Sequence, residues 1–274
     1  MKSVEFVKSR PTVLVTNDDG IRAEGLNLLA DALSTDYDVW VVAPDREQSA
    51  QSHALTLHRP LRITKEGTQR FSVDGRPSDA VYVAVHHLIP GEVDLVLSGI
   101  NHGANLGDDV VYSGTVSAAA EAAHMGLRAI AFSQNGTSPF DFRAALIFAV
   151  DLVHKVFSHP TEGHRLLSVN IPPRAPEEIR GVLTTRLCRR RYDYAVDERV
   201  DPAGKPYVWI GGPELDLDPL PGSDALAVRE GYISVTPLML DWTDYAGLGR
   251  MAWLEAAGPL EPGDASSGGE GRSG

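Results

Sequence analysis

The sequence contains a single cysteine, Cys188, among its 274 residues. An intrachain disulfide is therefore impossible, which excludes a small fold held together by disulfides and fits the reducing cytoplasm as the expected location. Three arginines follow Cys188 directly, and such neighbours are able to lower the pKa of a thiol. Because no second cysteine or obvious base lies near it in the sequence, we interpret Cys188 as a structural residue.

Basic residues are scarce relative to acidic ones. Lys and Arg number 25 against 37 Asp and Glu, which gives a formal net charge of -12 and a pI of about 5.1. Proteins that bind duplex nucleic acid depend on basic patches, so this balance argues against such a partner. It leaves open a small phosphorylated ligand that is held by a metal ion and backbone N–H groups.

Long apolar runs are also missing. No stretch approaches the roughly 18 apolar residues of a membrane span, and residues 1–10 lack the apolar core of a secretion signal. We therefore expect neither a membrane partner nor export. The apolar and charged fractions, 43% and 23%, are ordinary for a globular protein. The length slightly exceeds what one core usually holds, so we expect a large α/β domain with a smaller appendage.

Two nucleotide-binding motifs are absent. The first predicted strand, residues 12–16, is not followed by G-x-G-x-x-G, and G-x-x-x-x-G-K-[ST] does not occur. The strand runs instead into Asn17, Asp18, Asp19 and Gly20. Adjacent side chains on a strand point to opposite faces, but a turn at glycine lets both carboxylates reach one point. Their repulsion, about 4 kcal/mol at an effective dielectric near 20, is removed by a divalent cation. A polar turn that begins a helix explains this stretch equally well.

Strand and helix patterns alternate along the first part of the chain. This order predicts right-handed βαβ units in an α/β fold: a Rossmann-like open, mainly parallel sheet with helices on both faces. We expect residues 53–63 to form a hairpin-like excursion. Strands are predicted at 12–16, 38–43, 71–73, 93–97, 128–133 and 166–171, and helices at 24–33, 77–88, 116–124 and 140–157.

The alternation ends at Pro172, where prolines and charges become frequent. We therefore divide the chain into a Rossmann-like catalytic core at 1–171 and a C-terminal region at 172–257. This region has an extended hairpin at about 182–210, with its turn near residues 201–204, and elements that pack back on the core. The Gly-, Ser- and acid-rich segment 258–274 is expected to be disordered.

Polar loops follow three of the predicted strands, at residues 17–20, 44–49 and 98–107. The carboxyl ends of parallel strands meet at one edge of a sheet, so these loops are expected to converge. They supply carboxylate, hydroxyl and amide oxygens, which suit Mg²⁺, Mn²⁺ or Ca²⁺ better than zinc. Helix-capping and turn-forming roles for Ser49, Asn101 and Asn105 are individually as plausible.

The predicted helix start at Ser113, Gly114 and Thr115 offers free N–H groups and a positive dipole end, which bind phosphate well. Ser113 and Thr115 serve equally well as simple helix caps. A metal site and an anion-binding helix start at the same sheet edge favour metal-assisted phosphoryl chemistry.

Taken together, these segments resemble the survival protein SurE family over most of residues 12–242. The specific motifs, in order, are Thr-Asn-Asp-Asp-Gly at 16–20, Val-Ala-Pro-Asp-Arg-Glu-Gln-Ser at 42–49, Ser-Gly-Ile-Asn-His-Gly-Ala-Asn-Leu-Gly at 98–107 and Tyr-Ser-Gly-Thr-Val at 112–116. Further matches are Ser-Val-Asn-Ile-Pro at 168–172, Trp-Ile-Gly-Gly at 209–212 and Gly-Tyr-Ile-Ser-Val-Thr-Pro-Leu at 231–238.

The resemblance implies a metal-dependent 5′/3′-nucleotidase that releases phosphate from nucleoside monophosphates and, in several members, trims short polyphosphate. It implies one Mg²⁺ or Mn²⁺ per subunit. It also implies that the C-terminal region forms homodimers or homotetramers through its hairpin and an exchanged tail. The family's metal ligands correspond to Asp18, Asp19, Ser49 and Asn101, and its phosphate contacts to Asn105, Ser113, Gly114 and Thr115. One departure is Arg76, which stands where the family often has threonine.

We expect direct hydrolysis by a metal-activated water, with Asp18 and Asp19 as catalytic residues and Asp19 as the base. His102 is placed to donate a proton to the leaving group, although a loop histidine often only faces solvent. Two alternatives remain at this point. One is a phosphatase that works through a phosphorylated Asp18, and the other is a nucleotide-binding or scaffold module without catalysis.

Overall fold

The computed structural model describes residues 10–159, 165–192, 196–210, 214–217 and 220–254. It divides into two compact units, residues 1–240 and 241–274. The expected disordered segment 258–274 lies outside the described residues. None of the described helices is both long enough and apolar enough to cross a membrane.

The first unit is built on a nine-stranded sheet with the strand order β3-β4-β2-β1-β5-β6-β7-β13-β8. The strands of this sheet are β1 (Thr12–Thr16), β2 (Asp38–Pro44), β3 (Ile63–Gly67), β4 (Arg70–Val73), β5 (Leu95–His102), β6 (Ala129–Gln134), β7 (Leu166–Ile171), β8 (Val182–Thr184) and β13 (Ile233–Leu238). Only the pairs β3–β4 and β7–β13 are antiparallel, so the sheet is mainly parallel, as predicted.

The described residues of the first unit form five α-helices and several short helical turns. The helices are α1 (Glu24–Leu33), α2 (Pro77–Val83), α3 (Gly114–His124), α4 (Arg143–Ser158) and α5 (Asp224–Arg229), with a π-helical turn η1 (Ala84–Leu88) and 3-10 turns η2 (Gly107–Val111) and η3 (Pro176–Glu178). The second unit contains α6 (Tyr245–Leu248) and η4 (Gly249–Leu254).

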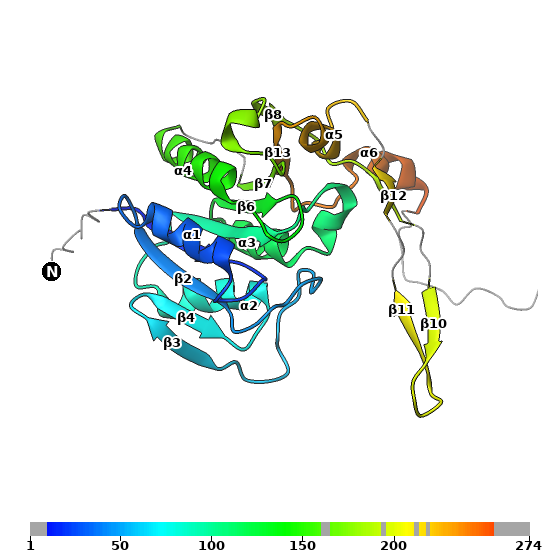
Figure 1. The fold of residues 1–274 in the computed structure, drawn as a ribbon, viewed down its shortest axis with the longest axis horizontal. Helices are drawn as coiled ribbons and strands as arrows, with labels where there is room; N and C mark the ends of the chain where they lie inside the picture. The colour runs from blue at the N-terminus through cyan, green and yellow to red at the C-terminus, as the bar shows by residue number, and fades with distance from the viewer. Residues whose placement is uncertain (1–9, 160–164, 193–195, 211–213, 218–219, 255–274) are drawn as a thin grey trace, which may run out of the picture. The chain divides into compact units, whose positions relative to one another are not determined.

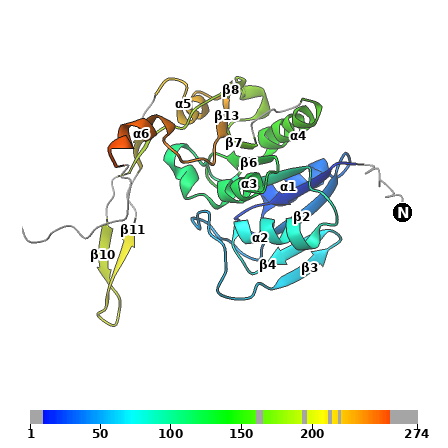
Figure 2. The ribbon, with the colours of Figure 1, turned by 180° about the vertical axis from the view of Figure 1, so that it is seen from behind.

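Strand β1 lies inside the sheet, between β2 and β5, and all five of its residues are buried. Side chains at alternate positions of β1 pack in two different hydrophobic cores, one on each face of the sheet. Val13 and Val15 pack in the core that α1 and α4 cover, whereas Leu14 packs in the core that α2 and α3 cover. Figures 1 and 2, drawn from opposite sides, show these helix pairs on the two faces of the sheet. Helices on both faces were predicted, and this is confirmed.

The position of β1 also determines where a ligand can bind. The chain passes from β1 to β2 on one side and later returns to place β5 on the other. The crevice at the carboxyl ends of β1 and β5 is therefore the point where the strand order reverses, which is the usual ligand position in an open α/β sheet. The predicted polar loops after β1 and β2 lie at this edge.

Two details of the main sheet differ from the sequence prediction. Strand β5 does not end before Ser98 but continues to His102, because Asn101 and His102 pair with Ser133 and Gln134 of β6 beyond an irregularity in the ladder. Residues 53–62 contain no strand, so the predicted excursion at 53–63 is not a hairpin; β3 and β4 form one after it, at residues 63–73.

The C-terminal hairpin is present but begins later than predicted. Strand β8 pairs in parallel with β13 in the main sheet and is therefore not a hairpin arm. The hairpin itself consists of β10 (Val196–Val200) and β11 (Pro206–Ile210), with a turn closed by a hydrogen bond from the Asp201 N–H to the Lys205 carbonyl. A further antiparallel pair joins β9 (Arg190–Tyr192) to β12 (Glu214–Leu217).

The close approach of α1 to β5 predicts a large cost for any side chain at Gly25. A Cβ there would lie 2.1 Å from the Ile100 carbonyl oxygen, a backbone atom that cannot move aside. Gly25→Ala should lower the free energy of unfolding by about 3 kcal/mol, measured by urea denaturation. The matched control is Gly67→Ala, whose Cβ would find its nearest neighbour at 3.6 Å. Equal stabilities of the two variants would contradict this packing.

Candidate metal and phosphate site

A closed turn ends β1 and presents the two aspartates. The Asn17 Nδ2 donates to the Gly20 carbonyl at 3.0 Å, and the Gly20 N–H donates back to the Asn17 Oδ1 at 3.2 Å. Gly20 has a φ of +96° and lies so close to the backbone of Arg46 that a Cβ would be 2.9 Å from its carbonyl carbon. Glycine is therefore required here by both conformation and space.

Asp18 is almost completely buried, with 4% of its surface exposed. Its Oδ1 accepts a hydrogen bond from the Thr115 Oγ1 at 2.5 Å. A Cβ at Gly114 would lie 2.7 Å from the Asp18 Cβ and Oδ2, so the first turn of α3 packs directly on this carboxylate. Burial raises the pKa of Asp18 to about 6; the Thr115 hydrogen bond opposes this shift and the charge of Asp19 adds to it.

Asp19 is held against His102 at the end of β5. Its Oδ2 accepts a hydrogen bond from the His102 backbone N–H at 3.2 Å, and its Oδ1 lies 3.7 Å from the His102 Nδ1. Burial raises the pKa of Asp19, while the His102 ring and N–H oppose this shift. The ring of His102 stacks on Phe140, with centroids 5.2 Å apart, and lies against Phe142. The imidazole is therefore fixed beside the carboxylate.

Side chains from β1, β5 and the start of α3 meet at a cavity of about 310 Å³. Its lining includes five of the eight predicted site residues, Asp18, Ser49, Asn101, Asn105 and Ser113, together with Ala50, His102, Asp109 and Tyr112. Asp19, Gly114 and Thr115 do not line it. Their contacts are with His102 and Asp18, as described above, so in this structure they lie behind the residues that face the cavity.

The oxygen atoms around this cavity fit a hard divalent cation. The Ser49 Oγ donates to Glu47 at 3.0 Å and keeps its lone pairs, and the Asn101 Nδ2 donates to the Gly103 carbonyl at 2.9 Å, which leaves Oδ1 as an acceptor. The Gln48 N–H donates to the Asp18 carbonyl at 2.8 Å and so holds this segment against β1.

Carboxylate, hydroxyl and amide oxygens are the ligands that Mg²⁺ and Mn²⁺ prefer. A cation would also stabilise the charged forms of two acids whose pKa values burial raises. Within the part of the chain that the structure describes, no group of three or more His, Cys, Asp or Glu side chains is placed to hold a metal. A cation at this cavity therefore needs neutral oxygens as well as the two acids.

The opposite wall of the cavity is the start of α3. Ser113 is the N-cap residue, and its Oγ accepts a hydrogen bond from the Val116 N–H at 3.1 Å. The helix N-terminus contributes partial positive charge toward the cavity. Asn105 lies nearby, and its Nδ2 donates to the Ser133 Oγ at 2.8 Å.

Sequence reasoning missed two buried residues that hold the loop after β5. Asn170 on β7 accepts from the Asn105 N–H at 2.8 Å and donates to the Asn105 carbonyl at 2.9 Å. The carboxylate of Asp224 accepts from the N–H groups of Gly107 at 2.7 Å and Cys188 at 2.9 Å. Asn170 lies in the matched segment at 168–172, whereas nothing local in the sequence marks Asp224. Burial and Asp224 raise the pKa of Cys188 to about 12, which supports its structural interpretation.

The pKa of Asp18 predicts how stability depends on pH in metal-free protein. The folded state keeps the Asp18 proton up to about pH 6, whereas an ordinary aspartate loses it near 3.8. The folded state therefore binds more protons between these values, and stability falls as the pH rises through them. As the pH rises from below 3.8 to above 6, the unfolding free energy of the wild type, taken relative to that of Asp18→Asn, should fall by about 3 kcal/mol. Urea denaturation in the presence of a chelator measures it. A difference that does not change with pH would contradict the assignment.

Known proteins resemble this chain in sequence and in fold. Residues 13–194 match the family model described as Survival protein SurE. The 5′-nucleotidase SurE of Geotalea daltonii is 50% identical over 234 residues, which is 85% of this chain and 94% of that protein. The 5′-nucleotidase SurE of Aeromonas hydrophila is 44% identical over 253 residues, or 90% of this chain and 99% of that protein.

A solved structure agrees with the fold. The crystal structure of the SurE protein from Aquifex aeolicus superposes with a TM-score of 0.81 at 42% sequence identity, and the match covers 90% of this chain and all of that one. The family match extends over more than half of the chain and includes the turn after β1, the end of β5 and the start of α3. The chain therefore belongs to the survival protein SurE family.

Proposed function

We propose that this chain is a metal-dependent nucleotidase that hydrolyses nucleoside 5′- and 3′-monophosphates to nucleoside and phosphate, with short polyphosphate as a further substrate. The observation that carries the proposal is the convergence of the buried Asp18, the oxygen atoms of Ser49 and Asn101, and the start of α3 on one cavity. The names of the relatives support the reaction class.

Asp18, Asp19, Ser49 and Asn101 would hold one Mg²⁺ or Mn²⁺ per subunit. When bound, such an ion polarises a phosphoryl oxygen and lowers the pKa of water. The protein's contribution is to keep Asp18 oriented, because the Thr115 hydroxyl donates to its carboxylate and Gly114 packs closely against it. Cation binding favours the ionised carboxylate, so metal affinity should rise as the pH passes about 6.

The substrate phosphate would be held by Asn105 and Ser113, which line the cavity, and by the helix start behind Ser113. Ser113, Gly114 and Thr115 supply the start of α3, whose N–H groups and dipole stabilise negative charge that develops in the transition state. Asn105 contributes its amide, and its position is set by Ser133 and Asn170. These donors are fixed before substrate arrives, which is the arrangement that electrostatic catalysis requires.

We assign proton transfer to Asp19 and His102. Asp19 is assigned as the base for the attacking water, which it would reach by way of His102, because His102 lines the cavity and Asp19 lies behind it. The His102 Nδ1 lies 3.7 Å from the Asp19 Oδ1, and stacking on Phe140 limits its movement. His102 is thus placed to carry a proton between this carboxylate and the leaving oxygen of the nucleoside.

The contacts of Asp18 bear on the covalent alternative. A carboxylate that accepts a 2.5 Å hydrogen bond and is 4% exposed is a poor nucleophile. We therefore expect no radioactive phosphate on the protein when turnover of ³²P-labelled AMP is stopped with acid. A phosphorylated Asp18 in that experiment would favour the covalent route. A non-catalytic module would show neither label nor released phosphate.

Removal of either carboxylate should abolish metal-dependent turnover. Asp18→Asn and Asp19→Asn should each lower kcat/KM for AMP with Mn²⁺ by about 100-fold or more, since a lost ligand disturbs a metal site at least as much as a lost outer partner. Released phosphate measures the rate. Asp108→Asn, an exposed acid outside the cavity lining, is the matched control and should keep wild-type activity. Near-wild-type turnover in both site variants would contradict the metal assignment.

We also propose that the chain forms a homodimer or homotetramer through the β10–β11 hairpin. The register places Glu198 opposite Val208, and the same face of the hairpin carries the apolar side chains of Val196, Ile210 and Val208. These three side chains are 60%, 91% and 55% exposed. An apolar face of this kind is costly in water and is typical of a surface that another chain covers.

The hairpin proposal predicts that a charge on this face separates the subunits. Val208→Asp and Ile210→Asp should each reduce the solution mass, measured by light scattering, to the 29.5 kDa of one chain. The wild type and the control Lys65→Glu, an exposed position on β3, should keep a multiple of that mass. A monomeric wild type would refute the proposal.

A further inference from the structure

A second cavity, of about 470 Å³, lies beside the segment that carries Ser49. It is lined by Arg46, Gln48, Gln51, Leu55, Thr56, Leu57, His58, Arg59, Gly75 and Arg76. None of these described lining residues is acidic, although the chain as a whole has a net charge of -12. The cavity is therefore a local concentration of positive charge and hydrogen-bond donors.

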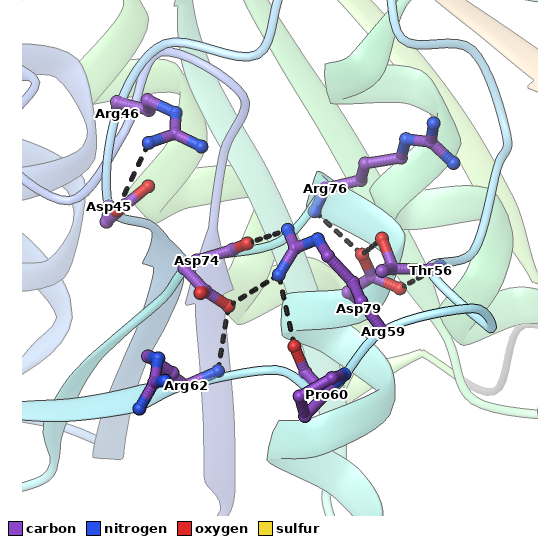
Figure 3. A network of polar contacts seen from close by, with 9 residues as sticks. All are labelled: Asp45, Arg46, Thr56, Arg59, Pro60, Arg62, Asp74, Arg76 and Asp79. Atoms are coloured by element: carbon purple, nitrogen blue, oxygen red, sulfur yellow. Dashed lines mark hydrogen bonds and ion pairs between the residues drawn. The ribbon is translucent and has the colours of Figure 1, made fainter.

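The walls of this basic pocket are held in place by one buried carboxylate. Asp79 at the start of α2 accepts hydrogen bonds from the Thr56 N–H at 2.8 Å and the Thr56 hydroxyl at 2.6 Å, and from the Arg76 N–H at 2.8 Å. Figure 3 shows these bonds, which join the segment of Thr56 to the start of α2. Asp79 is 2% exposed, and its oxygens are already engaged by Thr56 and the Arg76 backbone. The charge of the Arg76 side chain thus remains available for a ligand.

The three arginines of the lining, Arg46, Arg59 and Arg76, differ in how many hydrogen bonds and ion pairs they already form. Arg59 donates to the Asp74 carboxylate and to the Pro60 carbonyl, each at 3.1 Å, and also to the Asp74 carbonyl. The Arg76 guanidinium points away from this cluster in Figure 3 and donates only a long bond, 3.4 Å, to the Leu55 carbonyl. No described residue forms an ion pair with it.

Arg46 also keeps most of its hydrogen-bond donors free. Its Nη1 lies 3.8 Å from the Asp45 carboxylate, which is beyond hydrogen-bond distance, and its side chain is 65% exposed. Arg46 and Arg76 therefore retain free donors that face the same pocket. Guanidinium groups bind phosphate in bidentate fashion, and two of them complement a doubly charged anion.

The basic pocket and the metal and phosphate site share a wall. Gln48 and Gln51 line the basic pocket, whereas Ser49 and Ala50, the residues between them, line the first cavity. The wall is fixed to the site because the Gln48 N–H donates to the Asp18 carbonyl. A ligand held in the first cavity is therefore adjacent to the basic pocket.

We propose that the basic pocket is a second anion subsite, which binds a non-scissile phosphate of a nucleotide that carries two phosphate groups, such as a nucleoside 3′,5′-bisphosphate. The proposal rests on the nucleotidase function above: water cleaves one phosphate ester, and the products are inorganic phosphate and a nucleoside monophosphate. The lining favours an anion over a base, because the described lining contains arginine, glutamine and histidine but no Phe, Tyr or Trp on which a base would stack.

The test compares adenosine 3′,5′-bisphosphate with AMP, with Mn²⁺ present and the products identified by chromatography. The wild type should have a kcat/KM for the bisphosphate about tenfold above that for AMP. Arg76→Ala should lower this ratio about tenfold, which corresponds to about 1.4 kcal/mol. Arg62→Ala, a neighbouring arginine outside the lining, is the matched control and should keep the wild-type ratio. Arg46→Ala tests the same pocket if Arg76→Ala does not fold.

Each other outcome overturns the inference. A wild-type ratio at or below one refutes it, and so does an equal loss for both substrates in Arg76→Ala, which would place the arginine against the part that they share. Tripolyphosphate serves as a third substrate. If Arg76→Ala slowed only its hydrolysis, the pocket would bind a phosphate chain, and a nucleotide ligand would be refuted. Wild-type protein that hydrolyses neither nucleotide would refute the nucleotidase proposal itself, and this result is distinct from all of the others.

Discussion

The site depends on the burial of one carboxylate, Asp18, at the carboxyl end of a strand that is itself buried on both faces. Burial makes the charged form costly and raises the pKa of Asp18 to about 6. The hydrogen bond from Thr115 partly offsets this cost, and Gly114 packs closely against the carboxylate. A bound cation, as proposed, would stabilise the charged form of this carboxylate, so the contact of the start of α3 with Asp18 would contribute directly to the proposed chemistry.

Polar contacts between distant parts of the chain hold the rest of the site. Asn170 is 65 residues from Asn105 and satisfies both its N–H and its carbonyl. Asp224 is 117 residues from Gly107 and binds its N–H. Loops rich in glycine and asparagine have many accessible conformations, and these buried clamps select one of them. The C-terminal part of the first unit thus contributes to the site, although none of its described residues lines the cavity.

The segment from Gln48 to Gln51 separates two environments of opposite charge. On one side the cavity contains carboxylates and suits a metal ion, and on the other the pocket contains arginines with free donors. A substrate with two anionic groups would use both sides. Under these proposals the cation site and the arginines would supply positive charge locally, and the remaining surface of this acidic protein would not need to.

The sequence by itself determined the elements whose signals are local. The apolar run at residues 12–16, the alternation of strand and helix patterns, and the turn at Gly20 predicted the parallel sheet, the helices on both faces and the edge where the polar loops meet. Tertiary structure alone decided the remainder. β5 continues through Asn101 because β6 offers it partners, β8 leaves the hairpin to pair with β13, and Thr115 turns to Asp18 instead of the cavity. Each of these outcomes depends on hydrogen bonds and close contacts between residues far apart in the chain, which no local pattern encodes.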